Sequence, residues 1–195
     1  MANEHQLLIV RKGCDNMKIR RAAADDIASV EKIYDAVHTA EEKGEQQTGW
    51  IRGVYPVRAT AEEALRRNDL FVLEDDGALY GSGIINNIQP EVYSRGSWKH
   101  AADGNQVCVL HTLAIHPSRR GRGYGREFLA FFENYAAEHG CPELRIDTNE
   151  RNKAARQMYT KRGYTEIGIV PTQFNGIPDV RLVLLEKYLG KVPEK

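Results

Sequence analysis

The segment 107–138 constrains the fold more than any other part of the chain, because an apolar run leads through a Gly- and Arg-rich loop directly into a helical pattern. Residues 107–115 are rich in β-branched and apolar side chains, Pro117 cannot continue a strand ladder, and residues 127–138 carry apolar residues at helical spacing. Residues 118–126 contain three glycines and four arginines. We therefore predict a strand, an anion-binding loop and a helix, in that order.

Spacing separates the phosphate-binding loops that such a segment could form. Glycines allow close approach of a ligand, and the first N–H groups of a helix favour a phosphate. The segment lacks the Gly-Lys-Ser/Thr sequence of a P-loop. Gly121, Gly123 and Gly125 fall at every second position, which does not match the Gly-x-Gly-x-x-Gly dinucleotide fingerprint. Both of these nucleotide-binding classes are excluded.

The segment instead resembles motif A of the GNAT superfamily of acyl-CoA-dependent N-acyltransferases. The motif's pattern Arg/Gln-x-x-Gly-x-Gly/Ala is met by Arg120, Gly123 and Gly125. Downstream, residues 152–164 resemble the family's motif B, with Asn152 at its start and Tyr159 within it. The order and separation of the two blocks fit the superfamily, and the resemblance covers residues 17–189.

The resemblance implies an α/β (α+β) GNAT fold, a twisted mixed sheet of about seven strands flanked by about four helices, with splayed fourth and fifth strands. Residues 17–22 resemble the first strand of the family. Local patterns predict further strands at 144–148, 164–170 and 180–185, and a hairpin of 70–74 with 78–86. Asp25 or Asp26 is expected to cap the first helix, and the capping box of Thr60 and Glu63 to begin the second. The segment 171–179 is predicted to be a loop.

The resemblance also implies a site for acetyl-CoA. The backbone of Leu113, Ala114 and Ile115 would bind the pantetheine arm and polarise the acyl carbonyl, and the amide of Asn152 would pair with pantetheine. The pyrophosphate would lie on the loop and helix start formed by Arg120, Gly121, Arg122, Gly123, Tyr124, Gly125 and Arg126.

Two residues are candidates for the chemistry. Tyr159 in motif B would donate its hydroxyl proton to the departing CoA sulfur, as the resemblance implies. An attacking amine must also lose a proton, and alternation places His111 on the same strand face as Leu113. A histidine stands at the corresponding place in arylalkylamine acetyltransferases. Many other members use a glutamate nearer the position of Val109, so the identity of the base stays open.

The acceptor is predicted to contact the variable segments 39–58, 89–106 and 171–179. These segments supply aromatic side chains that could form the walls of an acceptor pocket: Trp50, Tyr55, Tyr93, Trp98 and Phe174. They also supply Glu41, Glu42, Glu45 and Asp179 as ammonium partners. Aromatic faces and carboxylates suit a small cationic amine. A protein N-terminus as acceptor, or a purely structural role for the aromatics, remains an alternative.

Charge and cysteine content narrow the function classes further. Lys plus Arg and Asp plus Glu are equal at 27 each, so we expect neither a nucleic-acid nor a membrane partner. The chain has three cysteines without CxxC spacing, and no metal site is predicted. The absence of a signal-like start or a long apolar run predicts a cytoplasmic protein.

The sequence as a whole predicts one domain, residues 1–195, in which residues 1–16 form an N-terminal extension whose apolar run 6–10 could add an edge strand. The predicted activity is N-acetyl transfer from acetyl-CoA to a primary amine of a small molecule by direct attack in a ternary complex. A CoA-binding regulatory or sensor module is the alternative from a different class. A homodimer is left open.

Overall fold

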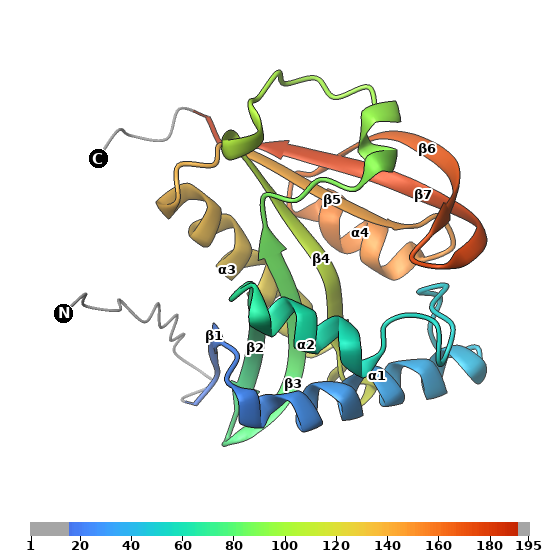
Figure 1. Cartoon of the computed structure of the whole chain (residues 1–195). Helices are drawn as coiled ribbons and strands as arrows, with labels where there is room; N and C mark the ends of the chain where they lie inside the picture. Colours follow the sequence, from blue (N-terminus) through green and yellow to red (C-terminus); the bar gives the residue numbers. More distant parts are fainter. Residues whose placement is uncertain (1–15, 191–195) are drawn as a thin grey trace.

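The computed structural model describes residues 16–190. Seven strands form one mixed sheet in the order β1-β2-β3-β4-β5-β7-β6, with helices on both faces (Figure 1). The strands are β1 (Lys18–Arg21), β2 (Leu70–Asp75), β3 (Ala78–Asn86), β4 (Val107–Ile115), β5 (Glu143–Asn149), β6 (Thr165–Phe174) and β7 (Ile177–Tyr188). The helices are α1 (Ile27–Glu42), α2 (Arg58–Arg66), α3 (Tyr124–Glu138) and α4 (Lys153–Lys161), with short 3-10 turns η1 (Ala24–Asp26), η2 (Glu91–Arg95), η3 (Gly104–Gln106) and η4 (Pro117–Arg119).

Strand alternation divides the core between the two faces of the sheet. Leu70 and Val72 of β2 pack with α1 and α2, whereas Phe71 and Leu73 pack in the cluster that contains α3. Successive side chains of a strand point to opposite faces, so both faces of β2 are covered. The predicted GNAT-type sheet with its flanking helices is confirmed.

The splayed strands of the fold arise from a local irregularity in β4. β4 and β5 run parallel and pair only from Val107↔Glu143 to Leu110↔Ile146. The register between β3 and β4 shifts beside Gly83, and Thr112 there has a φ of 50°. A β-branched residue in the left-handed region is strained, and a bulge bends its strand. The bulge therefore turns the end of β4 away from β5.

Several boundaries differ from the prediction for local physical reasons. α3 begins at Tyr124, earlier than the predicted 127, because Gly123 adopts a φ of 91° as its N-cap. Thr60 lies inside α2, where its hydroxyl accepts from the Val57 N–H (3.1 Å), so it does not begin that helix. Asp26 precedes α1, but its carboxylate accepts from the Ala23 N–H (2.7 Å) and does not cap the helix.

The prediction of a loop at 171–179 is wrong. β6 and β7 continue through it and turn at Asn175 and Gly176, both of which have positive φ. An Asn-Gly pair suits the tight turn of a hairpin. The predicted strand at residues 6–10 lies outside the described residues.

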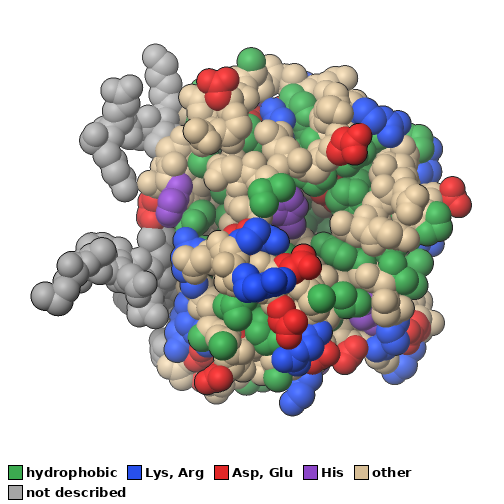
Figure 2. All heavy atoms as spheres, viewed as in Figure 1, with side chains coloured by type: hydrophobic (Ala, Val, Ile, Leu, Met, Phe, Trp, Pro, Cys, Tyr) green, Lys and Arg blue, Asp and Glu red, His purple; other side chains and the backbone are tan. Residues whose placement is uncertain are grey.

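The surface charge and the helices relate to the predictions about nucleic-acid and membrane partners. On the face drawn in Figure 2, Lys and Arg side chains are interspersed with Asp and Glu side chains. None of the helices within residues 16–190 combines the length and the apolar character that crossing a membrane requires.

Candidate active site

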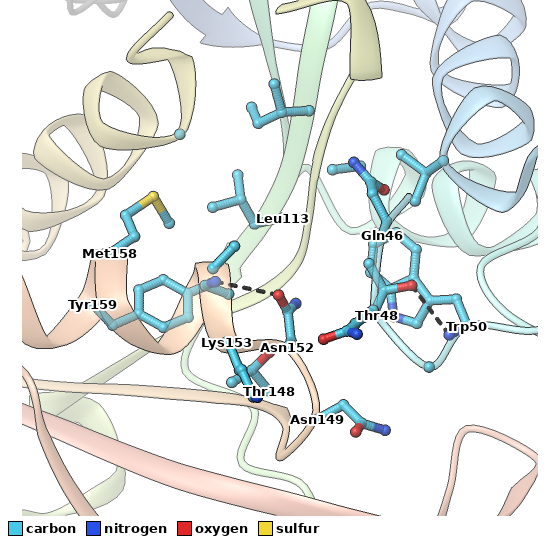
Figure 3. A pocket seen from close by; sticks show the side chains of 18 of the residues that line it. Gln46, Thr48, Trp50, Leu113, Thr148, Asn149, Asn152, Lys153, Met158 and Tyr159 are labelled. Atoms are coloured by element: carbon cyan, nitrogen blue, oxygen red, sulfur yellow. Dashed lines mark hydrogen bonds between the residues drawn. The ribbon is translucent and has the colours of Figure 1, made fainter. Parts of the chain in front are cut away.

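A cavity of about 880 Å³ opens where β4 and β5 diverge. β4 beyond the bulge, the start of α3, α4 and the segment 44–50 form its walls. In Figure 3, Met158 and Tyr159 lie across the cavity from Gln46, Thr48 and Trp50. The volume lies within the range of about 300–1,000 Å³ that is usual for small-molecule sites.

The predicted anion loop forms one end of this cavity. Gly123 caps α3 with no side-chain hydrogen bond from the described residues, and the first-turn N–H groups of a helix have no acceptor within the helix. The Arg120 guanidinium donates to the Glu45 carbonyl, which ties the loop to the segment after α1. The Arg119 guanidinium lies 4.0 Å from the centre of the Tyr80 ring. Arginine side chains thus brace the loop, and its backbone turns back on itself, since the Arg120 N–H donates to the Pro117 carbonyl (3.0 Å) and the Arg122 N–H to the Arg119 carbonyl (3.2 Å).

Most of the predicted cofactor residues line the cavity together: Leu113, Ala114, Ile115, Arg120, Gly121, Gly123, Tyr124, Gly125, Arg126 and Asn152. Arg122, which is exposed, does not belong to the lining, and the prediction for it is corrected. Asn152 has a second role, since its Oδ1 accepts from the Ala155 N–H (3.2 Å) and caps α4. Only its amide N–H groups remain to pair with a ligand carbonyl.

Tyr159 lies in the wall formed by α4. Its side chain is 5% exposed. Burial and the nearby Asp147 carboxylate raise the pKa of its hydroxyl well above the usual value. The hydroxyl therefore stays protonated over the physiological range and is a hydrogen-bond donor toward the cavity.

Asp147 is a cavity residue that the sequence analysis missed. It is the first β5 residue beyond the last β4–β5 pair, and it lines the cavity, as does His111 of β4. Its Oδ2 accepts a hydrogen bond from the Tyr93 hydroxyl (2.9 Å). Burial raises the pKa of Asp147 to about 6, while the Tyr93 hydrogen bond opposes that rise. Asp147 is therefore ionised at neutral pH and able to take up a proton.

His111 occupies the corresponding position on β4. Its Nε2 lies 3.1 Å from Oδ1 of Asn86, and the Asn86 amide in turn donates to Asp69 (2.7 Å). Burial lowers the pKa of His111 to about 4. His111 is consequently neutral at physiological pH. Burial thus shifts the two pKa values in opposite directions, upward for Asp147 and downward for His111, so Asp147 takes up a proton more readily than His111 does.

The predicted acceptor aromatics separate into two groups. Trp50, Tyr55 and Phe174 line the cavity, and Trp50 meets Tyr55 edge to face at 6.1 Å. Tyr93 and Trp98 do not line it, which corrects the prediction for both. Tyr93 is only 2% exposed and packs beneath the long loop, and the Trp98 indole donates to the Tyr93 carbonyl (2.7 Å). Tyr93 is therefore a buried residue and Trp98 packs against it, so neither ring forms part of the cavity wall.

A smaller cavity of about 540 Å³ adjoins the first. Both are lined by Gly49, Trp50, Asn149, Ile177 and Val180, so these residues form a shared wall. Asp179 and Glu41 both line the smaller cavity. The Glu41 carboxylate also accepts from the Thr48 N–H (2.6 Å) and the Gly49 N–H (3.0 Å), and the Glu42 carboxylate accepts from Arg52 (2.7 Å). These two acids hold local structure.

Known proteins share both sequence and fold with this chain. Residues 30–164 match the profile of the Acetyltransferase (GNAT) family. The chain is 26% identical to a streptothricin acetyltransferase from Escherichia coli over 140 residues, which cover 72% of this chain and 71% of that protein.

Among solved structures, the chain resembles a GNAT family acetyltransferase from Streptococcus agalactiae 2603, with a TM-score of 0.74, 26% identity and coverage of 97% of this chain and 100% of that one. YncA from Salmonella typhimurium, solved with acetyl-CoA, shares the fold at a TM-score of 0.65 and 17% identity, covering 92% and 98% of the two chains. The chain belongs to the GNAT family of acetyltransferases and is an acyltransferase enzyme.

Proposed function

We propose that this protein transfers an acetyl group from acetyl-CoA to a primary amine of a small molecule, by direct attack in a ternary complex. The observation that carries the proposal is the cavity itself, which joins the α3 N-terminus to the gap between β4 and β5 and then meets a second cavity at Trp50. A long anionic thioester and a separate acceptor can thus approach each other from two sides. The acetyl-CoA held by YncA supports this choice of cosubstrate.

The cosubstrate would extend along the cavity from the anion loop to the β4–β5 gap. Its pyrophosphate meets the N–H groups at the start of α3, where the helix dipole also favours negative charge. Its pantetheine arm lies against the β4 backbone beyond the bulge, because Leu113 to Ile115 have left the ladder with β5. A backbone N–H there would hydrogen-bond the developing oxyanion, which in comparable sites is worth about 3 kcal/mol.

Proton transfer is assigned to Asp147 in preference to His111, because Asp147 is the stronger base and lines the same gap. The bound ammonium gives one proton to Asp147, and the free amine nitrogen attacks the thioester carbonyl carbon. The C–N bond forms and the C–S bond breaks. Tyr159 gives its hydroxyl proton to the departing sulfur, and the second nitrogen proton, released as the amide forms, returns to the Tyr159 phenolate.

The acceptor is expected to enter through the smaller cavity, which opens toward Trp50 and Asp179. Trp50 and Tyr55 offer aromatic faces to a cation, and Asp179 offers a carboxylate. Cation–π contact and charge pairing together favour a small cationic amine. The streptothricin acetyltransferase similarity agrees with a small-molecule acceptor.

The direct test is turnover of acetyl-CoA against a library of amines, with release of free CoA thiol as the readout. Thiol release that depends on both acetyl-CoA and a small amine supports the proposal. Saturable CoA binding with no turnover on any amine would favour a sensor module instead. Turnover confined to peptides with a free N-terminus would assign a protein acceptor.

Substitution of Gly125 by Val is expected to weaken CoA binding at least tenfold. A Cβ at Gly125 would lie 2.9 Å from Sδ of Met158, which lines the cavity, so the added side chain forces Met158 into the space for the ligand. Calorimetric titration of CoA measures the change. Gly168→Val is the matched control, because a Cβ there meets open space on β6. Equal CoA affinity in the two folded variants would contradict the placement of the cosubstrate.

The two tryptophans are expected to respond differently to substitution. Trp50→Ala should raise the KM for the amine about tenfold with little change in acetyl-CoA binding, because Trp50 lies between the two cavities. Trp98→Ala should instead lower the melting temperature, since its ring packs 3.9 Å from the Arg145 guanidinium and under the long loop. Steady-state kinetics and thermal melts on both variants separate these outcomes. An unchanged amine KM in Trp50→Ala would place the acceptor elsewhere.

A further inference from the structure

A second cluster of reactive side chains lies away from the cavity, at the opposite end of β5. Glu143 begins β5, and Glu186 lies near the end of β7. Because Glu143 pairs with Tyr188 and Arg145 pairs with Glu186, all four side chains project from the same face of the sheet. His100, from the loop between β3 and β4, completes the cluster. Glu143 is four residues from Asp147, roughly 13 Å along the strand.

The two carboxylates are buried with too few donors. Glu143 is 0% exposed and Glu186 is 2% exposed. The Lys99 N–H donates to both oxygens of Glu186 (3.1 and 3.0 Å), whereas Oε2 of Glu143 finds no donor among the described residues. A buried polar atom without a partner raises the free energy of the folded state, so we expect this oxygen to contact a ligand.

Among the described residues, the Arg145 guanidinium contacts Glu143, but only weakly. Nε of Arg145 lies 3.4 Å from Oε1 of Glu143, a long hydrogen bond. The same guanidinium donates to Gln89 (2.6 Å) and stacks on Trp98. The Arg145 guanidinium is thus divided among Glu143, Gln89 and Trp98.

His100 supplies the third donor in a fixed orientation. Its ring stacks on Tyr188 with centroids 4.5 Å apart and planes within 9°. This stacking aims Nδ1 at the carboxylates, 3.7 Å from Oε2 of Glu143 and 3.9 Å from Oε2 of Glu186. The Nδ1 atom is itself buried without a partner among the described residues.

From this geometry we infer that His100, Glu143 and Glu186 bind one divalent first-row transition metal ion, with Zn²⁺ preferred. Ligands about 2.1 Å from a tetrahedral Zn²⁺ are about 3.4 Å apart. The two separations between His100 and the carboxylates, 3.7 and 3.9 Å, need to shrink by a few tenths of an ångström, and all three ligand atoms lie within 4.8 Å of one another. One imidazole and two carboxylates suit such a cation, and a water molecule would be the fourth ligand.

The ion would join the loop 89–106 to the ends of β5 and β7. Its role is structural, because it lies outside the residues that line the cavity. No ligand-spacing motif signals it in the sequence, since its residues are far apart in the chain and meet only through strand pairing.

The test is calorimetric titration of the full-length, tag-free protein with Zn²⁺, together with visible absorption of the Co²⁺ form. The wild type is expected to bind one ion, and His100→Ala to weaken binding about 100-fold. Glu143→Gln should act in the same direction. The matched control is His139→Ala, which removes an exposed histidine at the end of α3 and should leave metal affinity unchanged.

Thermal melts add a readout that does not depend on catalysis. Zn²⁺ should raise the melting temperature of the wild type and of His139→Ala, but not that of His100→Ala. The inference is overturned by an absence of saturable binding in the wild type, or by equal affinity in His100→Ala. A thiolate-to-cobalt charge-transfer band would also overturn it, because it assigns the ion to cysteines such as Cys108 and Cys141.

Discussion

Asp147→Asn is expected to lower kcat/KM at neutral pH by about 100- to 10,000-fold, the range typical for loss of a general base. Asparagine keeps the size of the side chain and can still accept from the Tyr93 hydroxyl, so the variant should fold. What it loses is the ability to take a proton from the bound ammonium.

The pH dependence gives this prediction its sharpest form. Because the pKa of Asp147 is raised to about 6, activity of the wild type should fall as pH drops below about 6, where the carboxylate is protonated. Between that value and the pKa of an alkylamine, about 10, the wild-type rate should be flat. The variant can use only the unprotonated amine, so its log(kcat/KM) should rise with pH, with a slope of about one, across the same interval.

Three further variants control this experiment. Tyr93→Phe removes the hydrogen bond that lowers the pKa of Asp147. The fall in activity at low pH, the acidic limb of the pH–rate profile, should therefore move to higher pH. Asp25→Asn, at an exposed carboxylate before α1, should change nothing. His111→Ala should keep the limb near pH 6. If the limb disappears in His111→Ala and persists in Asp147→Asn, the base is His111.

The missed role of Asp147 shows where the sequence stops being informative. The strand 144–148 was predictable from its apolar and β-branched residues, and an acid within it is the one signal of something unusual. Its position in the gap depends on the end of the β4–β5 ladder, which the bulge at Thr112 decides. Nothing in the local sequence around Thr112 predicts a left-handed residue, because β-branched residues normally avoid that region.

The anion loop was more accessible to prediction because its chemistry is local. Gly123 has the left-handed φ that the glycine pattern requires, and Gly125 faces Met158 closely enough to exclude a side chain. Tyr93, in contrast, meets Asp147 across 54 residues of sequence. A long-range contact of this kind decides whether an aromatic residue is a pocket wall or a buried hydrogen-bond donor. The spacing of residues in the sequence does not predict such a contact.

Tyr159→Phe is expected to lower kcat about 100-fold while the dissociation constant of CoA changes little. The substitution keeps the ring that packs in the core and removes only the hydroxyl. The raised pKa keeps that hydroxyl protonated, so it acts as a donor when negative charge develops on the leaving sulfur. An interaction made mainly in the transition state lowers kcat and kcat/KM together, and leaves ground-state binding intact.

A neighbouring tyrosine provides the matched control for this experiment. The Tyr164 ring lies 6.0 Å from that of Tyr159, and its hydroxyl is buried without a partner among the described residues. Tyr164 does not line the cavity, so Tyr164→Phe removes an equivalent buried hydroxyl without touching the ligand. Steady-state kinetics and CoA titration on both variants should show a loss of kcat only in Tyr159→Phe. Equal rates in the two variants would make the Tyr159 hydroxyl a packing group, and the sulfur would then have to leave with solvent as its proton source.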